Sequence, residues 1–433
     1  MESVKFSDER IVESYELIRH KSGLLIYLFP KQMTTAYALF ATKFGSVDTC
    51  FRLEGETDFS TVPDGIAHFL EHKMFESEDG TDAFTRFAAV GANANAYTTN
   101  STTAYLFSCT EGFNEALAEL LHFVMHPHFT KENVKKEQGI IAQEIQMYED
   151  SPGNVLYMQL LAGLYQKHRV RNNIAGTCDS IQEITPELLY RCYRGFYRPD
   201  NMILAICGSF SREEVLALVD QEVPCLPPEK VERDMPKEPK EIANAYLEKR
   251  MSIARPMIAI GVKDTFSSED PVLRERRCIC MDILNDLMFG KTSAFYHRLS
   301  KEGVISDDFS ADYDLLSTCA YNSFFCECDD PERIFAEIRQ EVLCYQRQVP
   351  AREDFERLRR CYYVDYLRAF DSTEDIANAL VSSACRGFEL FRSGQLILDV
   401  TYEELLSVMA DFYSSPEYVR SVILPVEEEE EHE

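Results

Sequence analysis

The sequence predicts an α+β protein made of two homologous halves in tandem. In each half, strand-like runs rich in β-branched and aromatic residues come first, and segments of helical periodicity follow. The halves also share a recurring segment, which starts at Thr185 and again at Thr401. Both copies open on a Thr N-cap, continue as an amphipathic helix ending in Phe-Tyr, pass a proline-bearing turn and enter an apolar strand. A tandem duplication accounts for both observations.

A stretch rich in proline and charge divides the chain. Residues 223–243 hold five prolines and many charged side chains, where the apolar periodicity of the flanking segments stops. We therefore expect an N-terminal domain at 1–222, a linker at 223–243 and a C-terminal domain at 244–433. The acidic end of the chain, from Val426 on, is expected to be a solvated tail.

The composition limits the classes of function. The 433 residues include 73 acidic and 44 basic ones, and the net charge of −29 argues against binding nucleic-acid backbones or anionic membranes. The 14 cysteines are scattered through apolar runs, as expected for reduced, mostly buried thiols. No basic region followed by an apolar run opens the chain and no stretch reaches the length of a membrane span, so we expect a cytoplasmic protein.

The elements of the first half can be assigned in order along the chain. Apolar and aromatic runs ended by turn formers predict strands at 23–30 and 35–48, and a further strand at 95–110. Helical periodicity with a credible cap or proline at an end predicts helices at 113–127 and 130–150.

The segment 63–77, PDGIAHFLEHKMFES, combines a predicted helix with metal-ligand residues. With Asp64 as the N-cap, His68 and His72 lie four residues apart and therefore face the same side. Glu71 lies one step round, within reach of a metal-bound water. Ala67, Leu70 and Met74 form an apolar stripe on the opposite side, so packing does not require the histidines. A catalytic zinc site needs three protein ligands and an open position, so a third ligand is required.

The helix at 130–150 offers two candidates for that ligand. Glu137 and Glu144 are seven residues apart and share a face, beside Ile140, Ile141 and Ile145, which are expected to bury it. Two carboxylates on an apolar face need a counter-charge, which zinc would supply. Spacing alone does not choose between them.

A second group of histidines, His122, His126 and His128, lies at the end of the helix at 113–127. Pro127 ends the helix, and no acid accompanies the histidines in the sequence. We expect them to complement the helix dipole rather than to bind a metal.

Three motifs together resemble one family. HFLEH has the HxxEH form of the inverzincins, and with NAYTTNSTTAYLF and EQGIIAQEIQMYED it is similar to the insulinase or pitrilysin-type M16 peptidases, among them the short bacterial YmfH-like members. The resemblance extends over essentially the whole chain. It implies two M16-type (LuxS/metallohydrolase-like) α+β domains forming half of a clamshell, the first with zinc and the second without. It also implies a Zn²⁺-dependent metalloendopeptidase that hydrolyses extended or unfolded peptides.

The same resemblance implies roles for individual residues. It makes His68 and His72 zinc ligands, Glu71 the general base, Glu144 the third ligand and Glu137 a second catalytic acid next to the ligands. It also places Asn95, Ala96 and Tyr97 on an edge strand that binds the substrate by backbone pairing.

The chain departs from the family in its second half. Many active members supply an arginine and a tyrosine seven residues apart, but the matching positions at 290–310 hold Leu299 and Ser306, and Tyr296 and Arg298 have the wrong order and spacing. This departure implies a paralogous M16 subunit, or a second copy of this chain, as partner. Two alternatives stay open: a zinc-binding accessory subunit with little peptidase activity, as in elongation factor P modification, and a structural duplicate whose histidines are only packed in the core.

Overall fold

The computed structural model describes residues 2–78 and 80–426, which form two compact units. Unit 1 consists of Met1–Gln146, Asn173–Met235 and Tyr366–Arg392. Unit 2 consists of Met147–Asn172, Pro236–Asp365 and Ser393–Glu433. The acidic segment after Val426 lies outside the described residues.

Unit 1 is built on a mixed sheet of seven strands in the order β1-β2-β3-β9-β4-β8-β7. These strands are β1 (Glu2–Asp8), β2 (Glu13–Arg19), β3 (Leu25–Pro30), β4 (Ala36–Thr42), β7 (Asn93–Thr98), β8 (Thr103–Cys109) and β9 (Met202–Gly208). All residues of β4 and β9 are buried, as their continuous apolar sequences favour. The strand expected at 23–30 is present as β3, and the one expected at 35–48 is present as β4 but ends at Thr42. Strand β9 lies between them, parallel to β3 and antiparallel to β4.

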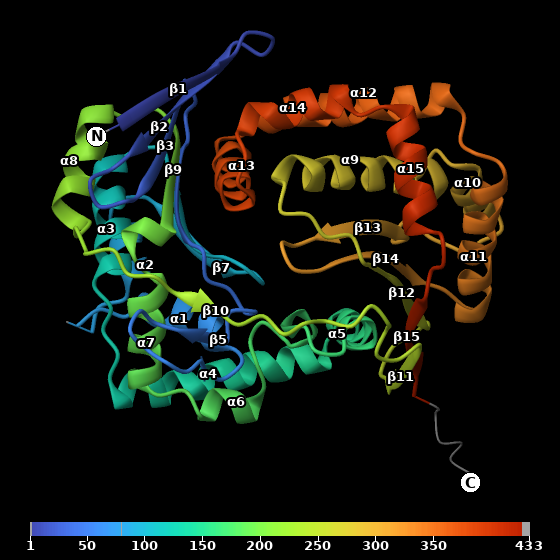
Figure 1. Ribbon diagram of the computed structural model, residues 1–433. Coiled ribbons are helices and arrows are strands. Elements are labelled where there is room, and N and C mark those ends of the chain that lie inside the picture. The colour runs from blue at the N-terminus through green and yellow to red at the C-terminus, as the bar shows by residue number, and fades with distance from the viewer. Residues whose placement is uncertain (1, 79, 427–433) are drawn as a thin grey trace. The chain divides into compact units, whose positions relative to one another are not determined.

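Helices cover both faces of this sheet. The helices of unit 1 are α1 (Ile66–Met74), α2 (Ala83–Ala89), α3 (Phe113–Met125), most of α4 (Lys131–Asp150), α6 (Cys178–Gln182), α7 (Pro186–Phe196), α8 (Arg212–Glu222) and α13 (Thr373–Arg386). Helices α3 and α8 pack together on one side, and α13 lies against β9 and β4 on the other (Figure 1). A small second sheet has the order β10-β5-β6, with β5 (Cys50–Arg52), β6 (Ser60–Thr61) and β10 (Glu232–Arg233).

The single strand expected at 95–110 is wrong, because this segment is a hairpin. Strands β7 and β8 pair in register and are joined by a turn in which Thr99 N donates to Thr102 O at 2.8 Å. The Thr99 hydroxyl also accepts a hydrogen bond from Thr102 N, at 3.0 Å. The polar run from Thr98 to Thr102 is thus a turn signal within an otherwise strand-like sequence.

The duplicated segment folds alike in both places. Thr185 caps α7 through Leu188 N, and Thr401 caps α15 (Tyr402–Phe412) through Glu404 N. Helix α7 leads into β9, and α15 leads into β15 (Tyr418–Pro425). The expected order of cap, helix, turn and strand is confirmed, as is the two-domain α+β fold.

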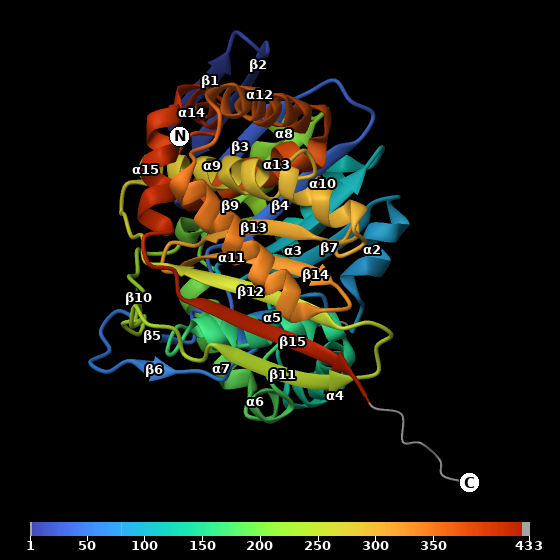
Figure 2. The same ribbon diagram turned by 90° about the vertical axis from the view of Figure 1, so that its right-hand side faces the viewer.

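Unit 2 contains a five-stranded sheet in the order β11-β15-β12-β14-β13 (Figure 2). Its remaining strands are β11 (Tyr246–Met251), β12 (Met257–Asp264), β13 (Ser310–Leu315) and β14 (Ala320–Glu327). Its other helices are α5 (Pro152–Leu164), α9 (Pro271–Met288), α10 (Ala294–Lys301), α11 (Pro331–Arg347), most of α12 (Arg352–Arg368) and most of α14 (Leu390–Asp399). Helix α5 packs on one face of the sheet, where Leu160 and Leu164 approach Gly261 of β12, and α11 lies on the other face.

The compact units differ from contiguous halves in two segments. Helix α5 precedes the linker but belongs to unit 2, and α13 follows it but belongs to unit 1. The reason is burial, because each sheet has a second apolar face that these helices cover. The predicted sequence domains at 1–222 and 244–433, with a linker at 223–243, stay a prediction.

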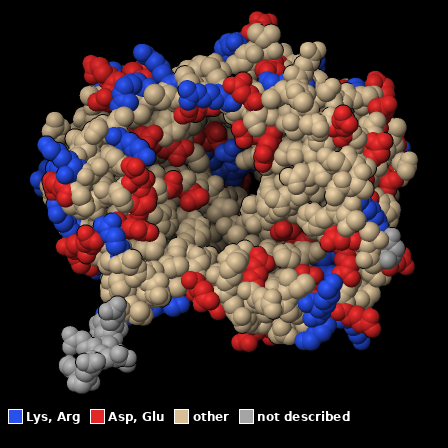
Figure 3. Space-filling view, turned by 180° about the vertical axis from the view of Figure 1, so that it is seen from behind, with Lys and Arg blue, Asp and Glu red and all other residues tan. Residues whose placement is uncertain are grey.

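Surface charge and thiols agree with the composition. On the face shown in Figure 3, Lys and Arg are interspersed with Asp and Glu and form no continuous basic patch. All 14 cysteines lie in the described part of the chain as free thiols, and eight of them are buried. Among the described residues, no helix is long and apolar enough to cross a membrane.

Candidate metal centre

Helix α1 begins one residue later than the sequence suggests. Asp64 is not its N-cap, because Gly65 holds that position with φ at +90°. A side chain at Gly65 would bring its Cβ within 2.4 Å of the Ala175 carbonyl oxygen, so only glycine fits this left-handed turn. The Asp64 carbonyl instead accepts a hydrogen bond from Ser180 Oγ at 2.8 Å, which anchors the start of the helix.

The two histidines of HxxEH lie together on α1. Their ring centroids are 4.6 Å apart, and His68 is buried. On the opposite side Ala67, Leu70 and Met74 are at most 2 % exposed, as their apolar stripe predicts. The core is therefore filled without the imidazoles, which are free to face a ligand.

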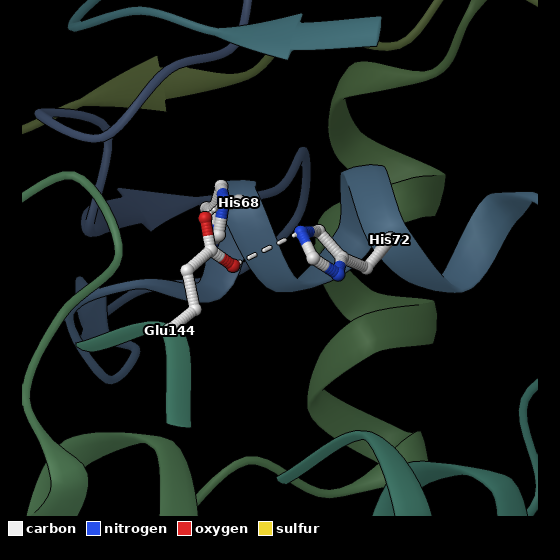
Figure 4. Close-up of side chains that lie close together, drawn as sticks. All are labelled: His68, His72 and Glu144. Atoms are coloured by element: carbon white, nitrogen blue, oxygen red, sulfur yellow. Dashed lines mark ion pairs between the residues drawn. The ribbon is translucent and has the colours of Figure 1, made fainter. Parts of the chain in front are cut away.

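Glu144 of α4 completes a set of three metal-ligand atoms (Figure 4). Its Oε1 lies 3.6 Å from His68 Nε2, and its Oε2 lies 3.4 Å from His72 Nε2. Ligands about 2.0–2.1 Å from a tetrahedral zinc ion are roughly 3.3 Å from one another, so the spacing fits that metal. Of Glu137 and Glu144, between which sequence spacing does not choose, Glu144 is the one whose oxygens lie beside the Nε2 atoms of both histidines.

Glu137 contacts the outer side of the same histidine. Its Oε1 lies 3.2 Å from His72 Nδ1, and this contact favours the tautomer whose Nε2 lone pair faces Glu144. His68 differs, since its buried Nδ1 has no hydrogen-bond partner among the described residues. Of the neighbouring isoleucines, Ile141 and Ile145 are buried as expected, whereas Ile140 is 45 % exposed.

Lys73 is a member of the site that motif reasoning missed. Its side chain is fully buried, and its Nζ lies 2.5 Å from Glu76 Oε2 and 3.5 Å from Glu137 Oε2. The signal in the sequence is a lysine inside the buried helix, directly after the motif. A metal ion bound by His68, His72 and Glu144 would add positive charge beside the carboxylates of Glu71, Glu137 and Glu144.

The environment shifts the pKa values of the site. Burial lowers the pKa of His68 to about 4, with the His72 charge acting in the same direction. Burial also acts to lower the pKa of His72, but the hydrogen bond with Glu137 and the charges of Glu71 and Glu144 raise it overall. Burial raises the pKa of Glu71. For Glu137, burial is outweighed by its contacts with His72 and Lys73, and its pKa is lowered.

Thr98 is the second residue that the motifs did not reveal. Its hydroxyl, on strand β7, donates to Glu71 Oε2 at 2.6 Å. This bond fixes the carboxylate and lowers the pKa of Glu71 against the effect of burial. The strand that carries the expected substrate-binding residues therefore also orients the expected base.

The strand with Asn95, Ala96 and Tyr97 lies at the edge of the seven-stranded sheet. In β7 these residues pair with β8 on one side, and β7 ends the sheet on the other. Ala96 N donates to Asn95 Oδ1 at 2.9 Å, and Tyr97 OH donates to Asn378 Oδ1 of α13 at 3.0 Å. An edge strand of this kind can accept an extended peptide by backbone pairing.

The residues of the 290–310 region are engaged within unit 2. Tyr296 OH donates to Asp307 Oδ1 at 3.1 Å, and Arg298 forms an ion pair with Glu337 at 2.8 Å. The Ser306 hydroxyl donates to Asp308.

No acid accompanies the second histidine group in the sequence, but the structure brings one to it from a distant segment. Glu222, at the end of α8, lies beside His122 and His126, and the three offer ligand atoms within 4.8 Å of one another. Sequence reasoning missed this acid because it is a hundred residues away along the chain. His128 is not part of the group.

Comparisons with known proteins agree with the geometry. Residues 61–178 match the model of the insulinase family, Peptidase family M16, and residues 183–361 match that of the Peptidase M16 inactive domain. The uncharacterized zinc protease YmfH of Bacillus subtilis is 35 % identical over 409 residues, which cover 93 % of this chain and 95 % of that protein. A putative M16-like peptidase from Alicyclobacillus acidocaldarius is 36 % identical with a TM-score of 0.91, covering 95 % of this chain and 98 % of the other.

More distant structures share the fold alone. A protease from Helicobacter pylori has a TM-score of 0.79 at 17 % identity, with 95 % of this chain and all of the other covered. With the family models and the full-length similarity to YmfH, these findings show that the chain belongs to the insulinase family of peptidases, M16.

Proposed function

We propose that the protein is a zinc-dependent metalloendopeptidase that hydrolyses extended or unfolded peptides. The observation that carries this proposal is the set of His68, His72 and Glu144 ligand atoms at zinc-like spacing, with Glu71 on the adjacent position of the same helix. Several relatives are named zinc proteases, which points in the same direction.

The roles of the residues follow from their contacts. His68, His72 and Glu144 would hold a zinc ion, which would supply Lewis acidity to the attacking water and to the scissile carbonyl. Glu71 accepts the proton of the attacking water and passes it to the leaving amine, and its raised pKa brings it closer to neutrality for both steps. Glu137 holds the His72 ring in its ligating tautomer.

Substrate binding is assigned to strand β7. Its free edge at Asn95, Ala96 and Tyr97 would pair with the backbone of an extended peptide, leaving the substrate side chains loosely selected. A folded protein cannot offer a free extended segment easily, so the substrate class is extended or unfolded chains.

The proposal includes a partner and a compartment. The arginine and tyrosine expected of the second half are missing, and the nearest candidates, Arg298 and Tyr296, pair with Glu337 and Asp307. A paralogous M16 subunit, or a second copy of this chain, would supply the missing donors for the developing oxyanion. We place the protein in the cytoplasm.

A second candidate function rests on the same missing pair. A chain that binds zinc but lacks these donors could act in assembly or recognition, as an accessory subunit in protein modification such as that of elongation factor P. This role does not depend on proton transfer by Glu71.

The test is hydrolysis of a quenched fluorescent peptide library by the zinc-loaded chain, alone and with a paralogous M16 subunit. Glu71→Gln keeps the shape of the side chain but removes the base, and it should lower the rate at least about a hundredfold. Glu132→Gln, an exposed change on α4, is the matched control and should keep the full rate. Absence of cleavage in every mixture, despite bound zinc, would contradict the peptidase and favour the accessory role.

A further inference from the structure

A second group of metal-ligand residues lies apart from HxxEH, on other elements of unit 1. His122 is in the last turn of α3, His126 is the C-cap of that helix, and Glu222 is the last residue of α8. None of the three belongs to α1 or α4, which carry the first group. Helices α3 and α8 pack against each other (Figure 1). This packing brings the three side chains together.

The hydrogen bonds of His126 leave one nitrogen free to bind a metal. Its Nδ1 lies 2.8 Å from the carbonyl oxygen of His122, and a carbonyl only accepts hydrogen bonds. Nδ1 therefore carries a proton, and the neutral ring presents the lone pair of Nε2. Metal-binding histidines commonly use this arrangement, in which a backbone carbonyl holds the non-ligating nitrogen.

The other two residues are held close to this ring. The rings of His122 and His126 stack with centroids 4.3 Å apart, and His122 Nδ1 lies 3.0 Å from Glu222 Oε2. Gln221 Nε2 donates to the other carboxylate oxygen of Glu222 at 2.7 Å, which orients the group. The ligand atoms of the three residues all lie within 4.8 Å of one another, so a small shift brings them to one ion.

The charge of Glu222 adds a second argument. Its side chain is only 12 % exposed, and among the described residues its carboxylate forms no ion pair with Lys or Arg. The partners that it does have, an imidazole and an amide, leave its charge uncompensated when His122 is neutral. A divalent cation would compensate it.

We propose that His122, His126 and Glu222 form a second transition-metal site, which binds Zn²⁺ with solvent completing the coordination. Two imidazole nitrogens and one carboxylate oxygen suit zinc and its neighbours rather than calcium or magnesium. The ion would join α3 to α8, so it stabilises the packing of these helices by binding the folded state alone. This site is independent of the proposed peptidase activity.

The experiment counts zinc ions bound by the full chain after equilibration with zinc, by elemental analysis and titration calorimetry. All proteins carry His432→Ala, because His432 lies outside the described residues and is a further imidazole. We expect two zinc ions per chain. His126→Ala and Glu222→Gln should each weaken the binding of one ion at least about tenfold, since even loss of an indirect partner of a ligand has such an effect.

His128→Ala is the matched control, because this histidine is two residues from His126 but outside the group. It should leave both ions bound. In a Glu144→Ala chain, which lacks a ligand of the first site, one ion should remain, and cobalt in its place should show the visible absorption bands of a nitrogen and oxygen site.

One zinc ion in the chain that carries only His432→Ala, an unaltered second ion in both variants, or loss of that ion with His128→Ala would each overturn the proposal. The count on the chain with only His432→Ala does not depend on the folding of a ligand variant. If the proposal is overturned, the group is a hydrogen-bonded imidazole–carboxylate pair at the end of a helix.

Discussion

Replacing Lys73 with methionine should destabilise the metal-free protein by about 3 kcal/mol, near the lower end of the effect of breaking a buried ion pair. The methionine keeps most of the apolar stem but removes the ammonium group. Glu76 is 32 % exposed and can be solvated, whereas Glu137 is only 10 % exposed and loses its cation. His72 still contacts Glu137, which keeps the estimate at the lower end of the range.

The assay is urea unfolding of the wild type, Lys73→Met, Glu137→Gln and the double variant, each with EDTA and with zinc. The double variant should recover most of the loss, because Glu137→Gln removes the carboxylate left unpaired. Zinc should reduce the effect of Lys73→Met, since a metal ion next to His72 partly replaces the missing positive charge. An effect below about 1 kcal/mol, with no recovery in the double variant, would refute this charge balance.

The other predictions concern local features of each unit. Gly65→Ala should lower the free energy of unfolding by more than about 2 kcal/mol, measured in urea with Gly139→Ala as an unstrained control, because a Cβ at Gly65 collides with backbone at positive φ. Thr98→Val removes a hydrogen bond that lowers the pKa of Glu71, so the acidic limb of the kcat/KM profile should move to higher pH, and an unmoved limb would contradict this role. Burial lowers the pKa of His168 to about 4, so folding stability should fall by up to about 3 kcal/mol as the pH drops from 6.5 to 4, where the unfolded chain takes up the proton. His168→Asn should flatten this dependence in urea unfolding between pH 7 and 5, and an unchanged slope would contradict it.

The histidines and carboxylates of the candidate metal centre could be predicted because their spacing is local. Helix geometry alone brings His68 and His72 to one side, and it places Glu137 and Glu144 on one face of the next long helix. The N-caps Thr185 and Thr401 could also be predicted from the sequence, because a capping hydroxyl accepts a hydrogen bond from a backbone amide only three residues away. Helix faces and N-caps of this kind depend on residues that are close together in the sequence, so they can be predicted without knowledge of the tertiary packing.

The rest depended on contacts between distant segments. Glu144 lies beside Nε2 of both histidines and Glu137 beside Nδ1 of His72 because of how α4 crosses α1, which the spacing along α4 does not predict. Glu222 reaches His122 only because α8 returns to pack on α3. The hairpin at 95–110 was missed because three of the five residues at 98–102 are threonines, which are common in strands.

The assignment of Glu144 as the third zinc ligand is tested most directly by zinc affinity. We would titrate zinc into Glu144→Ala and Glu137→Gln, both in a His126→Ala background so that the second site does not contribute. We expect Glu144→Ala to lose tight binding altogether, whereas Glu137→Gln should bind the ion about ten- to a hundredfold more weakly, as expected for a residue that only orients a ligand. Wild-type affinity in Glu144→Ala, or a greater loss in Glu137→Gln, would contradict it.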